Sequence, residues 1–321
     1  MRRGRVHNEL GCGAGALARS RPPGRLMASD QAGEGAGCGP GGRPTKSAPA
    51  KDRKPDTPGG SPAAAWKAAP ANSRRVRITL SYDGTQYHGW QVQPGLSTIQ
   101  GALESVLAEI EEREVHIDGS GRTDAGVHAL AQVAAFNLTN PLPLRNLCKA
   151  MNRLLSRDIR VLEAVEAAPG FHPRYDATAK TYEYRILRAE ICPPFERLYT
   201  LHHPFPLDEA VMIALAPLFE GRHDFSAFAA ADETDALGRS KERTIFSSRL
   251  ERFGDRLVYR VRGSGFLKHM VRNLVGVLLE AGKGNLSAGE IDARLQPGCT
   301  IPPGPSAPAR GLFLVSVEYQ A

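Results

Sequence analysis

Arg75-Val76-Arg77-Ile78-Thr79-Leu80-Ser81-Tyr82 is the stretch that decides the fold of this chain. Apolar side chains alternate with polar ones along it, so that Val76, Ile78, Leu80 and Tyr82 share one face. A period of two residues is that of a β-strand with one buried and one solvated face. We therefore expect a sheet with helices on one side only.

The residues that follow this strand indicate how the sheet continues. Ser97-x-x-Gln100 has the pattern of a capping box, and the residues after it place their apolar side chains on one helical stripe. A second helix is predicted from Leu144 to Leu155, and further strands over 115–118, 132–138 and 159–165. The order β-α-β-β-α-β is that of a split ferredoxin-like unit.

The second half of the chain gives nearly the same order. Strands are predicted over about 180–187, 244–250, 257–262 and 312–319, and helices after Asp208 as far as Gly221, over 266–281, and after Ser287-x-x-Glu290. We therefore predict an α/β (α+β) fold of two ferredoxin-like domains, 74–175 and 176–321. Each would be an antiparallel sheet with helices on one face, and the two would form a cleft.

Residues 1–73 differ from the rest in composition. They contain 12 Lys and Arg against 5 Asp and Glu, with 13 Gly and 9 Pro, whereas residues 74–321 contain 29 of each charge. Such a segment cannot bury enough apolar surface to offset its ordering entropy, so a disordered basic tail is predicted for 1–73. Because the remainder has no net charge, any nucleic-acid site must depend on local clusters.

Cysteine spacing and apolar runs exclude several classes of protein. The five cysteines have no CxxC pairing and no zinc spacing, and no apolar run reaches membrane-spanning length. A reduced cytoplasmic protein with no membrane contact is the expectation.

A glycine-rich loop at 119–129, GSGRTDAGVHA, holds the one carboxylate that requires a special explanation. Asp124 in this loop could be a turn residue, a metal ligand or a catalytic carboxylate. A metal site would have to use His116, Asp118, Asp124 and His128, which lack the helical histidine spacing of a zinc hydrolase. The loop alone leaves turn and catalysis open.

Five blocks resemble one family of enzymes. They lie in the family's order at 81–91 (SYDGTQYHGWQ), 121–129 (GRTDAGVHA), 171–184 (FHPRYDATAKTYEY), 266–276 (FLKHMVRNLVG) and 307–314 (APARGLFL). Together they are similar to the bacterial tRNA pseudouridine synthase A family from about residue 75 to the end. Ala131 stands where we expect a glycine of the family, and residues 1–73 lie outside the resemblance.

The resemblance implies a reaction and a set of partners. It implies an isomerase that converts uridine to pseudouridine in the anticodon stem-loop of tRNA, at positions 38–40. It also implies a homodimer with tRNA bridging the subunits, and neither cofactor nor metal. Which tRNAs are modified is not encoded in any pattern of the chain.

The same resemblance assigns roles to four residues. Asp124 would be the catalytic carboxylate, acting either by attack on the ribose C1′ or by removal of a C2′ proton, a choice the sequence leaves open. Arg272, in an apolar helix, would pair with Asp124. Arg122 would lie beside the space left by the displaced uridine and compensate for the lost stacking through phosphate contact or stacking. Tyr182 would stack on uracil, and its hydroxyl could take the C5 proton.

Other charged residues are weaker candidates. His128 is interpreted as an anchor of the loop rather than a catalyst. Phosphate contacts are expected from some of a group of basic residues, namely Arg174, Lys180, Arg185, Lys268 and His269. Two competing functions are a catalytically silent RNA-binding protein and a nucleoside hydrolase-like enzyme, in which water would take the sugar.

Overall fold

The computed structural model describes residues 72–231, 240–302 and 304–320. The tail predicted for 1–73 lies outside these residues except for its last two positions. All of the elements below belong to one compact unit that spans residues 63–321.

The first half has the predicted order of elements. They are β1 (Arg74–Tyr82), α1 (Ile99–Glu111), β2 (Asp118–Gly119), β3 (His128–Leu138), α2 (Leu144–Leu154) and β4 (Ile159–Glu166). The alternation in β1 is confirmed, because Val76, Ile78 and Leu80 are buried while the residues between them are half-buried.

The second half adds strands and helices in a related order. Its strands are β5 (Ala177–Leu187), β6 (Leu201–His202), β7 (Gly221–Asp224), β8 (Glu242–Phe253), β9 (Arg256–Gly263) and β10 (Leu312–Tyr319). Its helices are α3 (Glu209–Leu215), α4 (Met270–Gly282) and α5 (Ala288–Arg294), with short 3₁₀ turns η1 (Ala216–Phe219), η2 (Ser226–Phe228) and η4 (Ala309–Gly311).

The strands of both halves join into one sheet, which corrects the expectation of two. Within the described residues its order is β4-β1-β3-β10-β5-β9-β8-β7, with β2 on β3 and β6 on β5. The closing strand β10 makes the junction: it pairs antiparallel with β5 and parallel with β3 at Phe313 and Leu314. The mixed α+β class is confirmed, and the division into two domains stays a prediction.

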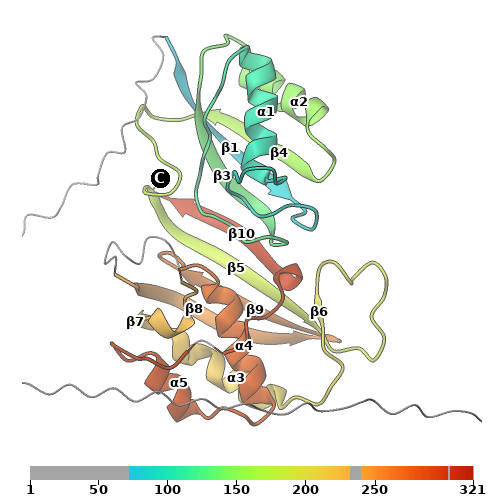
Figure 1. The fold of residues 1–321 in the computed structure, drawn as a ribbon, viewed down its shortest axis with the longest axis vertical. Helices are drawn as coiled ribbons and strands as arrows, with labels where there is room; N and C mark the ends of the chain where they lie inside the picture. The colour runs from blue at the N-terminus through green and yellow to red at the C-terminus, as the bar shows by residue number, and fades with distance from the viewer. Residues whose placement is uncertain (1–71, 232–239, 303, 321) are drawn as a thin grey trace, which may run out of the picture. The chain divides into compact units, whose positions relative to one another are not determined.

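The helices cover the face of the sheet that carries the apolar residues. Figure 1 shows α1 and α2 beside the strands of the first half and α3, α4 and α5 beside those of the second. One core cluster contains Leu80 of β1, Leu103 of α1, Tyr184 of β5 and Leu274 of α4. Burial of this apolar area is the main stabilising contribution to the fold.

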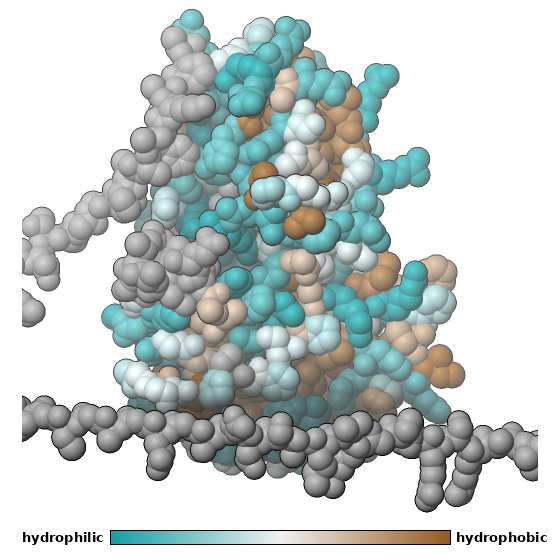
Figure 2. All heavy atoms as spheres, in the orientation of Figure 1, coloured by the Kyte–Doolittle hydropathy of each residue, from teal (hydrophilic) through white to brown (hydrophobic). Residues whose placement is uncertain are grey.

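The surface of the sheet and the loops carries charged pairs, such as Glu183 with Arg185 and Arg260, and a few exposed aromatic rings. Figure 2 shows a mostly hydrophilic surface with hydrophobic side chains gathered at the side of the loop that leads to β6. The large exposed apolar residues of that loop are Ile191 and Phe195.

Two predicted helix starts are wrong for local reasons. The capping box at Ser97 does not form; Thr98 is the N-cap and its hydroxyl accepts from Gly101 N, while the Gln100 amide donates to the Ile117 carbonyl. The helix predicted from 266 begins at Met270, because His269 has a left-handed φ of 60°. The capping box at Ser287 and Glu290 is confirmed.

The helix predicted after Asp208 is shorter than expected. Asp208 caps α3 as predicted, but α3 ends at Leu215 and continues as the 3₁₀ turn η1. Pro217 removes a backbone N–H donor there, which favours the change of helix type. Gly221 opens β7 instead of closing the helix.

Candidate active site

The loop between β2 and β3 is held by hydrogen bonds to the strands beneath it. The Gln132 amide donates to the Gly121 carbonyl at 2.9 Å, and Trp90 N donates to the Thr123 carbonyl at 3.0 Å. The hydroxyls of Tyr82 and Thr123 lie 2.8 Å apart. Each end of the loop therefore has a buried partner, which fixes the backbone around Asp124.

Asp124 does take part in a turn, but through its backbone. Val127 N donates to the Asp124 carbonyl at 3.1 Å, and Gly126 has a φ of 76°, a conformation that favours glycine. The carboxylate is not used in this turn. The turn explains the glycine beside Asp124 and leaves the side chain available.

Two glycines of the segment 83–90 let it approach the loop closely. A β-carbon at Gly84 would lie 2.0 Å from the Val127 carbonyl oxygen, and one at Gly89 would lie 2.5 Å from the Thr123 carbonyl oxygen. Only residues without a β-carbon fit at these distances. The segment 83–90 therefore packs directly against the backbone of the loop at Thr123 and Val127.

The Asp124 carboxylate faces the start of α4. Arg272 Nη1 lies 3.2 Å from Asp124 Oδ2, and His269 Nε2 lies 3.5 Å from the same oxygen. The side chains of Arg272 and Asp124 are 17% and 21% exposed. Arg272 is held in turn by donation from its Nε to the Ala307 carbonyl at 2.7 Å. The structure therefore brings Asp124 and Arg272 together, and adds a histidine that sequence reasoning placed only among phosphate contacts.

Tyr182 lies on β5 beside this pair and is only 7% exposed. Its ring meets the edge of Phe266 with centroids 5.0 Å apart. Burial, followed by the nearby Tyr82 and Asp124, raises the pKa of Tyr182 far above its ordinary value. Its hydroxyl is therefore protonated at neutral pH and is a poor acceptor for a C5 proton.

Arg122 stands on the solvent side of the same loop. It is exposed, and within the described part of the chain no hydrogen bond or ion pair is recorded for it. Arg122 differs from Asp124 in this respect, since a side chain without such contacts can rearrange when a ligand binds.

His128 has the geometry of an anchor. It lies 3.1 Å from Asp83 Oδ1, contacts the Leu198 carbonyl at 3.1 Å, and stacks on Phe313 at 4.7 Å. Burial lowers its pKa and outweighs the raising influence of Asp83. These contacts tie the end of the loop to β10 and to the segment before β6.

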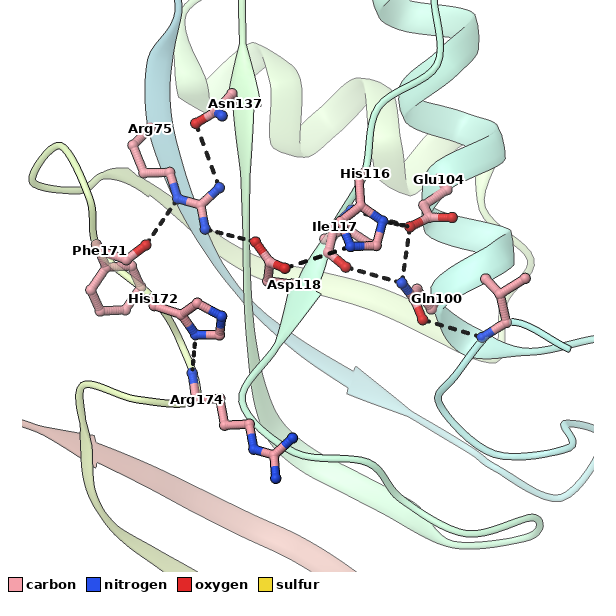
Figure 3. Close-up of polar contacts among 11 residues, drawn as sticks. Arg75, Gln100, Glu104, His116, Ile117, Asp118, Asn137, Phe171, His172 and Arg174 are labelled. Carbon is pink, nitrogen blue, oxygen red and sulfur yellow. Dashed lines mark hydrogen bonds and ion pairs between the residues drawn. The ribbon is translucent and has the colours of Figure 1, made fainter. Parts of the chain in front are cut away.

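The four residues considered for a metal site are directed to different partners. His116 lies 3.6 Å from Asp118, which pairs with Arg75 at 2.9 Å (Figure 3). Asp124 faces Arg272, and His128 faces Asp83. In the portion of the chain that the structure describes, no group of three or more ligating side chains could hold a metal ion.

Two members of the group of basic residues lie on β5, on opposite faces of the sheet. Lys180 is buried beside the loop and donates to the Ser120 carbonyl. Arg185 belongs to the other face, where it pairs with Glu183 at 2.8 Å and lies 3.9 Å over the Phe313 ring. It is therefore not brought to the site. Because successive residues of a strand face opposite sides of the sheet, the sequence of β5 already places Arg185 on the other face from Lys180 and Tyr182.

Comparison with known proteins adds an independent finding. A family model described as tRNA pseudouridine synthase matches residues 78–176 and 215–320. The chain belongs to the tRNA pseudouridine synthase family. Asp124 and Arg122 lie in the first matched range and Arg272 in the second, while Tyr182 falls between the two.

Individual relatives of this tRNA pseudouridine synthase agree with the family model. The chain is 62% identical over 247 residues to tRNA pseudouridine synthase A of Solibacter usitatus, covering 77% of this chain and all of that protein. It is 42% identical over 246 residues to the enzyme of the same name from Geotalea uraniireducens, again over 77% of this chain and all of the relative.

Among the helices of the described residues, none is long and apolar enough to cross a membrane.

Proposed function

We propose that this tRNA pseudouridine synthase isomerises uridine in the anticodon stem-loop of tRNA, at positions 38–40, with Asp124 as the catalytic carboxylate. The observation that carries the proposal is the 3.2 Å contact between Arg272 and Asp124. The Asp124 carboxylate is mostly buried, is paired with an arginine and makes no hydrogen bond within its turn. Such a carboxylate is suited to react with a substrate.

The reaction requires a carboxylate and no added group. The bond between ribose C1′ and base N1 breaks, the base turns, and C5 bonds to C1′ while C5 loses its proton and N1 gains one. Asp124 serves either as the nucleophile at C1′ or as the base at C2′, and both roles use the ionised form. Arg272 supplies the opposite charge that an ionised carboxylate needs in a partly buried site.

Tyr182 and Arg122 have supporting roles in this proposal. Tyr182 forms an apolar wall for the base, since its raised pKa makes proton removal by its hydroxyl unfavourable. Because Phe266 packs against it, uracil meets both rings. The target uridine leaves its stack at a cost of a few kcal/mol, and Arg122, exposed on the loop, compensates through phosphate contact or stacking beside the vacated space.

A homodimer is also part of the proposal, with a cytoplasmic location that follows from the tRNA substrate. The homodimer is supported by a hollow of about 550 Å³ on the face of the sheet opposite the helices. This hollow is lined by Phe195, Phe253 and Phe313 among charged residues. Phe195 is 88% exposed and Phe253 is 58% exposed. Aromatic side chains in such a setting suit contact with another protein surface.

The test of the proposed activity is incubation of the purified protein with unmodified tRNA, followed by chemical mapping of pseudouridine. Conversion of uridine without any change in mass is expected, and the Asp124→Asn variant serves as the control. Binding without conversion would indicate the silent RNA-binding protein instead. An abasic site would indicate the hydrolase-like enzyme.

A further inference from the structure

Lys180 is a buried cation next to the catalytic loop. Only 8% of the residue is exposed, and its ammonium donates to the Ser120 carbonyl. A β-carbon placed on Gly121 would lie 3.3 Å from Lys180 Nζ and 4.0 Å from the Tyr182 hydroxyl oxygen. An ammonium has three donors, and a buried one ordinarily has a carboxylate partner. Among the described residues no carboxylate lies within ion-pair distance of Lys180.

The charged neighbours of Lys180 are cations. Burial, and then Arg174 and Arg243, lower the pKa of Lys180 to about 8. Burial and Arg174 likewise lower the pKa of Arg243. No ion pair of either arginine is recorded in the described ranges. Three cations for which the described residues supply no counter-charge repel one another, and a bound anion would relieve that repulsion.

Arg174 is positioned by the network that Figure 3 shows. Arg75 Nε donates to the Phe171 carbonyl at 3.0 Å, and Arg174 N donates to His172 Nδ1 at 3.0 Å. The guanidinium of Arg174 points away from the Arg75–Asp118 ion pair in this view. The backbone that carries Arg174 is therefore fixed, while its charge is left available.

Arg243 reaches the same place from a third element. It lies at the start of β8, and its Nη1 donates to the Ser240 carbonyl at 3.0 Å. A β-carbon on Gly265 would lie 3.8 Å from the Cδ and Nε atoms of Arg243. Gly265 adjoins Phe266, which packs on Tyr182. Arg243 thus lies beside the segment that covers the candidate active site.

We propose that Arg174, Lys180 and Arg243 form a phosphate-binding site that holds the RNA backbone next to the uridine at Asp124. The inference rests on the proposed function for the identity of the anion, a phosphodiester of the substrate RNA. Arginine and lysine on rigid elements are the usual donors to phosphate oxygens. The closeness of Lys180 to Tyr182 places this phosphate at the target nucleotide or its neighbour.

The test is the salt dependence of RNA binding. Each phosphate contact adds nearly one to the slope of log Kd against log salt concentration, so Arg174→Met, Lys180→Met and Arg243→Met should each reduce the slope by about one. Lys149→Met on α2 and Arg249→Met on β8 remove the same charge from exposed positions and should leave the slope unchanged. The probe is an anticodon stem-loop RNA, with Kd measured at several salt concentrations.

Two further measurements keep the outcome decisive. Lys180→Arg keeps the charge and should keep the slope, and thermal unfolding of every variant identifies loss of fold. Unchanged slopes in folded Arg174→Met and Arg243→Met would overturn the phosphate site even where the parent protein converts uridine. If the three variants lower the slope but the parent protein does not convert tRNA, the phosphate site is upheld and the proposed function is rejected.

Discussion

At the scale of single residues, the contact between Arg272 and Asp124 determines what a substitution should do. Arg272→Ala leaves a mostly buried carboxylate without its cation, which costs less than the roughly 3–5 kcal/mol of a fully buried pair because both groups are about one-fifth exposed. We predict that kcat/KM falls about tenfold or more. Arg272→Lys should lose less, since it keeps the charge. Full activity in Arg272→Ala would contradict the role.

Lys180 gives a second prediction at this scale. Its pKa of about 8 in the folded protein lies below its ordinary value of 10.5, so between these pH values the unfolded chain binds more protons. Lys180 therefore contributes stability that increases with pH across this window, whereas below pH 8 the full cost of the buried charge is present. Burial raises the pKa of Tyr82 and Tyr182 in the folded protein, so the unfolded chain loses their protons first as pH approaches 10. This opposing contribution is the same in the parent and in a Lys180 variant, and it cancels from the difference between them.

Lys180→Met removes this titration. We predict that the Tm of the variant, relative to the parent, is constant below about pH 8 and declines from there to pH 10. Lys149→Met on the exposed side of α2 is the matched control and should show no such trend. If Lys180 only supports the loop, the difference in Tm between variant and parent should not depend on pH. That result would count against a buried Lys180 charge that binds an anion.

At the scale of elements, close approach between segments carries a prediction about glycine. Gly84→Ala would place a β-carbon 2.0 Å from the Val127 carbonyl oxygen, so the backbone of the catalytic loop must move. We expect a loss of about 1–3 kcal/mol in unfolding free energy, together with a slower conversion of uridine. Gly289→Ala on α5 meets no atom within 4 Å and should be neutral or slightly stabilising. Equal behaviour of the two variants would argue against the packing described for Gly84.

The periodicity of apolar side chains predicted which helices and strands are present better than it predicted where they begin and end. The strand alternation of β1 and the apolar stripe of α1 depend on many residues, so they were predictable from the sequence. The start of α4 was not, because the left-handed His269 depends on where the tertiary structure places Phe266 and the Asp124 contact. The cap of α1 was missed because Gln100 bonds to Ile117 and Glu104 instead of its own helix end.

At the scale of the whole molecule, the single sheet could not be predicted from local patterns. The parallel pairing of Phe313 with His128 joins residues far apart in sequence, and no alternation of side chains encodes such a partner. The candidate site has the same character. Asp124 and Arg272 were predictable through the family resemblance, whereas the convergence of Lys180, Arg174 and Arg243 depends on three separate elements.

The composition of residues 1–73 gives a prediction at this scale. A chain that begins at Asn72 should unfold cooperatively and convert tRNA as the full chain does, because the family match begins at residue 78. Somewhat weaker RNA binding at low salt is expected, since the 12 basic residues before Asn72 can add phosphate contacts. Loss of cooperative unfolding in the shortened chain would show that the first 71 residues belong to the fold. A chain that ends at Gly311 lacks β10 and should fail both measurements.

The central claim is that Asp124 is the catalytic carboxylate, and single-turnover conversion by Asp124→Asn tests it most directly. The substitution keeps the shape of the side chain and removes its charge, so the variant should bind tRNA as well as the parent, or slightly better. Enzyme is used well above Kd, so that binding does not limit the rate. We predict no detectable pseudouridine, and none from Asp124→Glu, because a displacement of about 1 Å can cost about a hundredfold in rate. Conversion by the asparagine variant within tenfold of the parent rate would contradict the account and leave Asp124 as a turn residue.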